Sequence, residues 1–392
     1  MWIIIFMVAI ASMFWFMGWR WENSTKRPEM KRTPLVSILV PAYNSEKTIA
    51  ATVESLQDMD YPKKEIIVVN DSDDKTPYIV KKLGAKIIQS KIRRGKAYSL
   101  NQAVKRAKGE ILFFVDSDTT VSSNALDKMV PWFSNPKIGA VAPMFRVKNR
   151  KNKLTKLISL EHQIQSALFK LHMSFGSMIA FRGCGVAIRR STFEKMGGWP
   201  YTLIEDTDLG AKMVSKGIKI HYEPEALAET IEPETFRELH NQRRRWGKGA
   251  AFSFIHHRKF YKKNSQFLLY FLPYIFLSLG ISLFLTAQTI MYFIPLVSLY
   301  LLSAVTITEI MFFMFLLMLP VHINIFIATT TATTGHIAIM TCGEKGRKGD
   351  WLYIIPYILI YVPLTLAFYI HGVLSGIKDK LKKRDELDLK DW

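Results

Sequence analysis

The chain has 392 residues, of which 49% are hydrophobic, and a formal net charge of +20. This length allows about two or three domains. Cations gather beside long apolar stretches, where anionic headgroups attract them, so the charge points to membrane lipids and excludes nucleic acid as the expected partner. The cysteines, Cys184 and Cys342, lie in different regions, which favours neither a disulfide nor a zinc site.

Residues 1–19 form the first apolar segment of the chain. A signal peptide is the competing interpretation, but a basic stretch does not precede the segment and no small-residue cleavage site stands out. We therefore predict a retained transmembrane anchor. The cations that follow it place the next domain in the cytoplasm by the positive-inside rule. They are Arg20, Lys26, Arg27, Lys31 and Arg32.

Residues 33–232 have the pattern of an α/β catalytic domain. Short runs rich in β-branched residues alternate with segments of helical spacing, which predicts a Rossmann-like, mainly parallel sheet covered on both faces. Ligands of such sheets bind beyond the carboxyl ends of the strands, so Asn44, Asp71 and Asp116 should converge. Expected strands cover 36–40, 65–70, 85–89 and 111–115, and expected helices cover 48–58, 79–83 and 97–107.

Two later segments are amphipathic. Apolar residues between Leu154 and Phe175 fall on one helical stripe flanked by lysines, and both core packing and a position on the membrane surface fit this pattern. Residues 233–264 adjoin a long apolar stretch, which favours an interfacial amphipathic segment there.

Residues 265–377 are predicted to be a transmembrane region of an α-helical bundle. Glu309 is the only formal charge between residues 267 and 342, and a soluble core could not contain so long an uncharged run. Residues 309–320 are either an interfacial helix or part of a span. About four crossings return the charged tail, 378–392, to the cytoplasm, although the cations of 345–348 then lie outside. The expected spans are 267–288, 290–308, 321–341 and 351–374. The expected location is the cell (plasma) membrane, with the catalytic domain in the cytoplasm.

Asp116-Ser117-Asp118 closes an apolar strand. Two carboxylates one residue apart can both reach a divalent cation if the backbone turns between them. Mg²⁺ and Mn²⁺ prefer oxygen ligands and commonly bridge to substrate phosphates. Acidic loops are common after strands, so this pattern gains its meaning from the motifs around it.

A nucleotide pocket is the functional interpretation of the polar residues that follow the first two strands, although turns alone also favour Asn and Asp. A carboxylate there can accept a hydrogen bond from a base N–H. Gly95-Lys96 opens a helix, where N–H groups and the lysine charge suit a diphosphate. The candidates are Pro41, Tyr43, Asn44, Glu46, Asp71 and Lys96.

Glu205-Asp206-Thr207-Asp208 lies before a predicted helix, where Thr207 or Asp208 could serve as a cap. Inverting glycosyl transfer needs one carboxylate to take a proton from the attacking acceptor hydroxyl. Asp206 is the first candidate for this base and Glu205 the second.

Gln242-Arg243-Arg244-Arg245-Trp246 combines guanidinium groups with an indole on a predicted helix. Arg and Trp also anchor interfacial helices to headgroups without any catalytic role. In the catalytic interpretation, Arg245 neutralises a leaving diphosphate and Trp246 offers a flat face to a sugar ring. Arg243 and Arg244 point to other sides of the helix, and at least one is expected to face lipid or solvent.

In this order the motifs resemble those of family-2 glycosyltransferases, in particular the processive membrane synthases of hyaluronan, chitin and cellulose. The resemblance runs from Pro34 to about Gly249, and its most specific part is the Q-(Q/R)-x-R-W motif at 242–246. It implies a GT-A fold, a UDP-sugar donor, Mg²⁺ or Mn²⁺, and inversion at the anomeric carbon. The second strand departs from the usual Asp-Asp-Gly-Ser and ends in Asn70-Asp71-Ser72-Asp73.

The resemblance also implies roles for individual residues. Asp71 would contact the nucleobase, Asp116 the nucleotide and metal, and Asp118 the metal. Asp206 would be the base. Residues 181–185 look like the loop that holds the acceptor, which makes Gly183, Cys184 and Gly185 acceptor-binding candidates. Gln242, Arg245 and Trp246 would bind the donor phosphates and the acceptor sugar.

The sequence therefore predicts a membrane-bound inverting glycosyltransferase that transfers a hexose from a UDP-sugar to a growing polysaccharide or glycan. The enzymatic alternative is a non-processive transferase that glycosylates a membrane lipid, such as a polyprenyl phosphate or diacylglycerol, from a UDP- or GDP-sugar. The length of the product separates these two. The non-enzymatic alternative is a transporter or sugar-binding scaffold, which metal-dependent donor hydrolysis would contradict.

Overall fold

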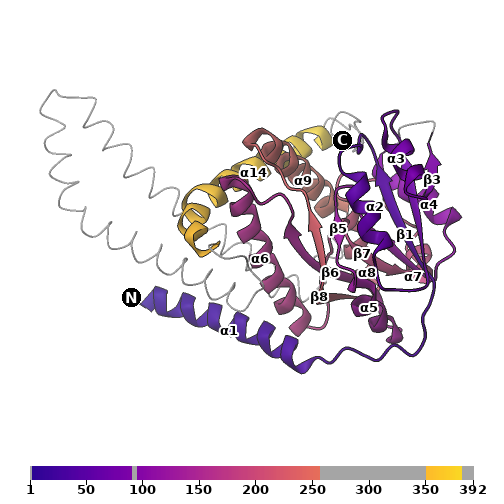
Figure 1. Cartoon of the computed structure of the whole chain (residues 1–392). Helices are drawn as coiled ribbons and strands as arrows, with labels where there is room; N and C mark the ends of the chain where they lie inside the picture. Colours follow the sequence, from indigo (N-terminus) through magenta and orange to yellow (C-terminus); the bar gives the residue numbers. More distant parts are fainter. Residues whose placement is uncertain (1, 91–94, 257–349, 382–392) are drawn as a thin grey trace, which may run out of the picture.

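The computed structural model describes residues 2–90, 95–256 and 350–381 (Figure 1). A long N-terminal helix leads into a mixed eight-stranded sheet whose strand order is β3-β2-β1-β4-β7-β6-β8-β5. The strands are β1 (Val36–Ala42), β2 (Lys64–Asn70), β3 (Lys86–Gln89), β4 (Ile111–Phe114), β5 (Thr120–Val121), β6 (Ile138–Val147), β7 (Val186–Arg189) and β8 (Lys219–Thr230).

Helices precede, connect and follow these strands in the described part of the chain. They are α1 (Trp2–Ser24), α2 (Ile49–Gln57), α3 (Thr76–Lys82), α4 (Lys96–Arg106), α5 (Ala125–Met129), the 3₁₀ turn η1 (Val130–Ser134), α6 (Lys153–Ser174), α7 (Arg190–Lys195), α8 (Glu205–Ser215), α9 (Phe236–His256), the 3₁₀ turn η3 (Asp350–Tyr353), α13 (Ile354–Pro356), the π-helical turn η4 (Tyr357–Tyr361) and α14 (Val362–Leu381).

The sheet is Rossmann-like over the strands that the sequence predicted, and mixed beyond them. β1 pairs in parallel with β2 and β4, and β2 with β3, as expected. Six of the eight described strands run in the same direction, so the sheet is mainly parallel as expected. The exceptions are β7, which runs antiparallel to both β4 and β6, and β5, which runs antiparallel to β8. The segment before β7 therefore lies at the carboxyl end of β4, where Val186 pairs with Phe114. This reversal brings residues 181–185 next to Asp116.

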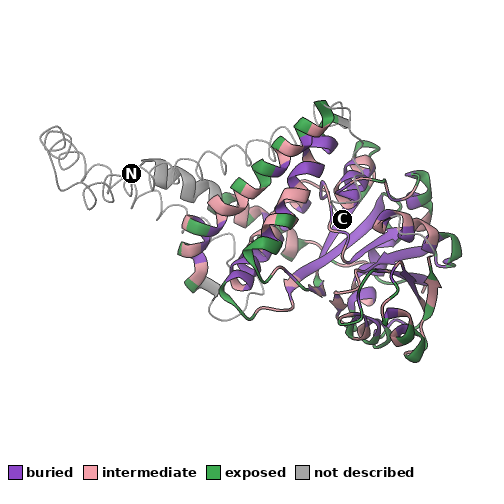
Figure 2. Cartoon of the chain, turned by 90° about the horizontal axis from the view of Figure 1, so that it is seen from above, coloured by how far each residue is buried: buried purple, intermediate pink, exposed green. Residues whose placement is uncertain are grey.

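Two apolar clusters cover the two faces of the sheet. Successive side chains of a strand point to opposite faces, so Ile38 and Val40 of β1 enter one cluster and Leu39 enters the other. All three side chains are fully buried. In Figure 2 the strands appear as a buried layer between helices whose outer faces are exposed. The sheet core holds the strand ends rigidly in place.

α6 packs as a core helix, which decides between the two interpretations of its apolar stripe. Leu157 and Ile158 are buried in a third cluster with Leu239 of α9 and Ile358 of η4. A reciprocal capping box of Asn152 and Thr155 fixes the first turn of the helix. Its other side meets α1, as Figure 1 shows.

α9 and α14 cross with their backbones in contact (Figure 1). A Cβ atom added to Gly372 would lie 2.1 Å from the carbonyl oxygen of Arg244, and one added to Gly247 would lie 2.1 Å from that of Tyr369. Lys248 and Asp379 form a 3.0 Å ion pair across the same crossing. Only glycine permits this approach, so the sequence of both helices determines how closely they pack.

Within the described residues, one helical segment, Ile354–Leu381, is long and apolar enough to cross a membrane. It overlaps the predicted span 351–374, while the other expected spans, 267–288, 290–308 and 321–341, lie outside the residues that the structure describes. Residues 2–19 of the predicted anchor, 1–19, fall within α1.

Candidate active site

A cavity of about 300 Å³ opens at the carboxyl ends of β1, β2 and β4. It brings together most of the expected donor-side residues, which come from separate parts of the chain. Its lining residues are Pro41, Ala42, Tyr43, Asp71, Gly95, Lys96, Ser99, Asp116, Ser117, Asp118 and Arg245.

Three candidates for donor binding do not line this cavity. Asn44 has a φ of 50°, and its N–H donates a 3.0 Å hydrogen bond to the hydroxyl of Ser72. The N–H of Glu46 donates to Asp74 at 3.1 Å. These two residues join the turns after β1 and β2 and so build the wall behind the cavity. The third, Gln242, contacts Glu232 instead.

Asp71 is oriented by a helix that the sequence analysis did not connect with it. The Ser99 hydroxyl of α4 donates a 2.5 Å hydrogen bond to Oδ2 of Asp71. Gly95, with a φ of 84°, allows the turn that starts α4, and the first N–H groups of this helix lie at the cavity beside Lys96. A helix N-terminus with a lysine is suited to bind phosphate.

Lys96 connects the two acidic motifs. Its Nζ lies 2.6 Å from Oδ1 of Asp116 and 3.4 Å from Oε1 of Glu205. Burial alone would lower the pKa of Lys96, but these two carboxylates raise it, so the ammonium group stays charged. Burial raises the pKa of Glu205, which is 5% exposed. The donor cavity and the Glu205-Asp206 motif therefore form one site.

Asp116 and Asp118 provide oxygen atoms at the cavity surface. Burial raises the pKa of Asp118 to about 6, and the charge of Asp116 adds to this effect. The carboxylates of Asp116 and Asp118 both line the cavity, and oxygen atoms are the ligands that Mg²⁺ and Mn²⁺ prefer, so the residues fit either ion. No group of three or more His, Cys, Asp or Glu among the described residues could hold a metal alone. Donor phosphates would have to complete the shell.

Asp206 points to the loop of residues 181–185. Its Oδ2 accepts a 2.8 Å hydrogen bond from the N–H of Gly183, and its Oδ1 accepts one of 2.6 Å from the N–H of Thr207. Both acidic residues are in the first turn of α8, where the helix dipole favours carboxylates, so they do not precede the helix as expected. Cys184 is a free thiol whose pKa burial raises.

The Gln242–Trp246 motif lies on α9, and only Arg245 of its residues lines the cavity. Arg243 is buried and Arg244 is half-buried, so Arg244 remains the candidate for the arginine that is expected to face lipid or solvent. Arg243 forms a 2.6 Å ion pair with Glu161 and lies 4.3 Å from the centre of the Trp246 ring. It thus covers one face of the indole.

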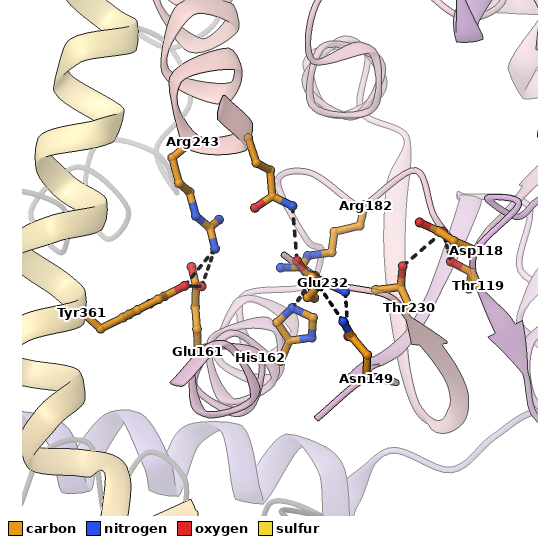
Figure 3. Close-up of polar contacts among 11 residues, drawn as sticks. Asp118, Thr119, Asn149, Glu161, His162, Arg182, Thr230, Glu232, Arg243 and Tyr361 are labelled. Carbon is orange, nitrogen blue, oxygen red and sulfur yellow. Dashed lines mark hydrogen bonds and ion pairs between the residues drawn. The ribbon is translucent and has the colours of Figure 1, made fainter. Parts of the chain in front are cut away.

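A second polar cluster adjoins this helix, and the sequence analysis missed it (Figure 3). Glu232 contacts His162, Arg182 and Gln242, while Thr230 donates a 3.4 Å hydrogen bond to Asp118. Thr230 is the last residue of β8, and Glu232 lies two residues beyond it. The only sequence signal is their position at the end of a strand.

Comparison with known proteins supports the motifs. The model of the Glycosyl transferase family 2 matches residues 37–197, which include the Asp116–Asp118 motif. Poly-beta-1,6-N-acetyl-D-glucosamine synthase of Staphylococcus epidermidis is 31% identical over 265 residues, which cover 63% of this chain and 64% of that protein. Probable glycosyltransferase YdaM of Bacillus subtilis is 34% identical over 270 residues, 64% of this chain and 63% of that one. The chain thus matches less than two thirds of either relative.

A solved structure confirms the architecture. The mannosyltransferase PcManGT from Pyrobaculum calidifontis, in complex with GDP-Man and Mn²⁺, aligns with 96% of this chain and 99% of its own chain. The TM-score is 0.56 and the sequence identity is 18%, so the likeness concerns the fold. It supports the GT-A assignment of the sheet domain.

Proposed function

We propose that this chain, whose residues 37–197 match the Glycosyl transferase family 2, transfers a hexose from a nucleotide sugar to a growing polysaccharide at a membrane. The observation that carries this proposal is the bridge made by Lys96. This one cation contacts Asp116 at the donor cavity and Glu205, the neighbour of Asp206, on the acceptor side. Lys96, the group that would hold the leaving diphosphate, thus contacts the residue next to Asp206, the expected base.

The donor that we propose is UDP-N-acetylglucosamine, because related synthases make poly-beta-1,6-N-acetyl-D-glucosamine. Asp71 would accept a hydrogen bond from the base, with Pro41 and Tyr43 beside the nucleoside. Lys96 and Arg245 would contact the diphosphate. Asp116 and Asp118 would hold Mg²⁺ or Mn²⁺, which when bound supplies positive charge to the departing diphosphate.

In the proposed reaction, Asp206 takes the proton of an acceptor hydroxyl as its oxygen attacks the anomeric carbon. The bond from that carbon to the diphosphate oxygen breaks on the opposite face, so the configuration inverts. The hydrogen bonds from Gly183 and Thr207 orient the carboxylate. The acceptor sugar would lie along the loop with Cys184 and Gly185 and on the face of Trp246 opposite Arg243.

We propose that the protein is attached to the membrane through its N-terminal anchor, 1–19, and the region 265–377, with the catalytic domain, 33–232, in the cytoplasm. The apolar segment Ile354–Leu381 supports this proposal. Residues 233–264 would lie at the interface, because α9 packs directly on α14. Membrane lipids and a nascent glycan are the implied partners.

The test is turnover by the purified full chain in lipid vesicles with UDP-N-acetylglucosamine and Mg²⁺ or Mn²⁺. We expect release of UDP together with a long amino-sugar polymer on a gel. A product with one added sugar would contradict polymer synthesis and support the lipid-glycosylating alternative. Turnover with a GDP-sugar alone would contradict the donor assignment. The absence of turnover with every UDP- and GDP-sugar would contradict the proposed function.

A further inference from the structure

Glu232 lies just beyond the end of β8, buried between α6 and α9 with 6% of its surface exposed (Figure 3). One amide fixes its backbone. The N–H of Glu232 donates to Oδ1 of Asn149 at 2.9 Å, and its carbonyl accepts from Nδ2 of Asn149 at 2.8 Å. The backbone that carries this carboxylate is therefore held in place just beyond the end of β8.

The two oxygens of this carboxylate face different parts of the molecule. Oε1 lies 2.9 Å from Nε2 of His162 and 3.7 Å from Nη1 of Arg182. Oε2 accepts a 3.2 Å hydrogen bond from the amide of Gln242. A single side chain thus contacts α6, the loop of residues 181–185 and α9.

The environment keeps this carboxylate ionised. Burial alone would raise its pKa, but the hydrogen bond from His162 and the charges of Arg182 and Arg243 lower the pKa of Glu232 to about 2. Removing one member of a buried charge pair leaves the other uncompensated, which is strongly unfavourable. Arg182, whose side chain is 17% exposed, would then have to move toward solvent.

Two of the contacts of Glu232, those with Arg182 and Gln242, lead to a reacting group in one step. Arg182 precedes Gly183, whose N–H holds Asp206. Gln242 lies one helical turn before Arg245, on the same face of α9, and Arg245 lines the donor cavity. The acceptor loop and the donor-side cation are therefore connected through one carboxylate.

We propose that Glu232 is a positioning residue that holds the acceptor loop and α9 in a fixed relation, so that Asp206 and Arg245 act on the same bound donor. This inference rests on the proposed transferase function. Without the Glu232 charge, the loop relaxes away from the acceptor while the donor still binds. Water then replaces the acceptor hydroxyl more often, and hydrolysis of the donor gains over transfer.

The test compares Glu232→Gln with Glu225→Gln in the full chain. Glu225 also lies on β8 and pairs with Arg27 and Lys128, but it does not touch the site. UDP release and sugar incorporation are measured in the same reaction, together with Tm. We expect E232Q to lower transfer by up to about 100-fold, as small misplacements do, and to raise the ratio of hydrolysis to transfer. A wild-type ratio in E232Q, or the same change in E225Q, would overturn the proposal.

Gln242→Leu interrupts only the arm to α9. We expect a higher KM for the donor with a wild-type ratio of hydrolysis to transfer. We expect no further rise in this KM when E232Q is added, because a glutamine at this position can still accept the hydrogen bond of Gln242, and E232Q acts through Arg182 and the acceptor loop. A further rise in the donor KM would contradict the proposal. If the E232Q variant does not fold, the Q242L variant alone tests the proposal. A donor KM of Q242L equal to that of the wild type would then overturn the proposal. Loss of the proposed function differs from all of these results, because the wild type itself would then be inactive.

Discussion

The backbone N–H of Gly183 donates a 2.8 Å hydrogen bond to Oδ2 of Asp206, so the loop expected to hold the acceptor also orients the expected base. A side chain at Gly183 would lie 3.5 Å from Asp206 and 3.4 Å from the ammonium group of Lys96. Base, loop and donor-side cation thus meet within a few ångströms. The proposed base and the proposed phosphate-binding lysine therefore both lie close to Gly183.

Asp206→Asn should abolish transfer while leaving donor binding nearly intact. Asparagine can still accept the Gly183 hydrogen bond, but it cannot take a proton, and general-base catalysis typically contributes about 10²- to 10⁴-fold. Single-turnover transfer and a titration with UDP measure the two effects separately. A loss of donor affinity as large as the loss of rate would rule out the base assignment.

Ser99→Ala should weaken donor binding with little change in kcat. The Ser99 hydroxyl orients Asp71, and a hydrogen bond to a charged group contributes about 1.5–3 kcal/mol, or roughly 10- to 100-fold in affinity as an upper range. The Kd for UDP checks this. Ser55→Ala in α2 is the matched control. Among the described residues, the Ser55 hydroxyl donates a hydrogen bond to the carbonyl of Thr52 and accepts one from the N–H of Val121. Equal effects of both variants would contradict a role of Ser99 at the nucleotide.

Gly372→Ala should destabilise the protein although alanine is the better helix former. Helix propensity favours alanine by about 1 kcal/mol, but the new methyl group would lie 2.1 Å from the carbonyl oxygen of Arg244. Overpacking typically costs about 1–3 kcal/mol, and here the neighbour is backbone that cannot rotate away. We expect a lower Tm and a weaker donor interaction through α9. Ala367→Ser, on the exposed side of α14, should leave both unchanged.

Acid should destabilise the fold through buried histidines. Burial, with the charge of Arg27, lowers the pKa of His221 to about 3, and burial lowers that of His172 to about 4. The unfolded chain, with a pKa of 6.5, therefore binds more protons. This stability is fully present above about pH 6.5 and declines as the pH falls toward the folded pKa values, by up to about 1.4 kcal/mol per pH unit for each histidine.

The pH dependence of Tm between about pH 7.5 and about pH 5 measures this loss. His221→Phe keeps a ring that can stack on Trp132, 3.7 Å from the imidazole in the native protein, but it cannot bind a proton. Its Tm should depend less steeply on pH. An unchanged slope would show that His221 does not contribute to acid destabilisation.

Local patterns were enough to predict that Asp71 and Asp116 lie at one cavity. Asp71 and Asp116 each follow a strand of a parallel pair, and the carboxyl ends of parallel strands meet at one edge, so their convergence needed no long-range information. The antiparallel strand β7 was missed because a strand of four residues is too short for its sequence to indicate its direction in the sheet. The stripe of α6 showed an apolar face, but its spacing could not reveal what covers it.

The polar contacts around Arg243 could not have been predicted from spacing. Glu161 lies 82 residues before Arg243 in the sequence and Tyr361 lies 118 residues after it, and neither belongs to a recognisable motif. Glu232 likewise follows a strand as many solvated acidic residues do. Which of these residues is buried depends on how α6, α9 and η4 come together, and that is a property of the assembled core.

The helices α9 and α14 cross at two glycines and should therefore move together. Side chains between packed helices normally adjust to small displacements, but at Gly247 and Gly372 the main chains are in direct contact. If α14 crosses the membrane as proposed, a tilt that a thicker or thinner bilayer imposes on α14 would therefore move α9 with it. Since Arg245 is on α9, the thickness of that bilayer would then set how far the guanidinium reaches into the proposed donor cavity.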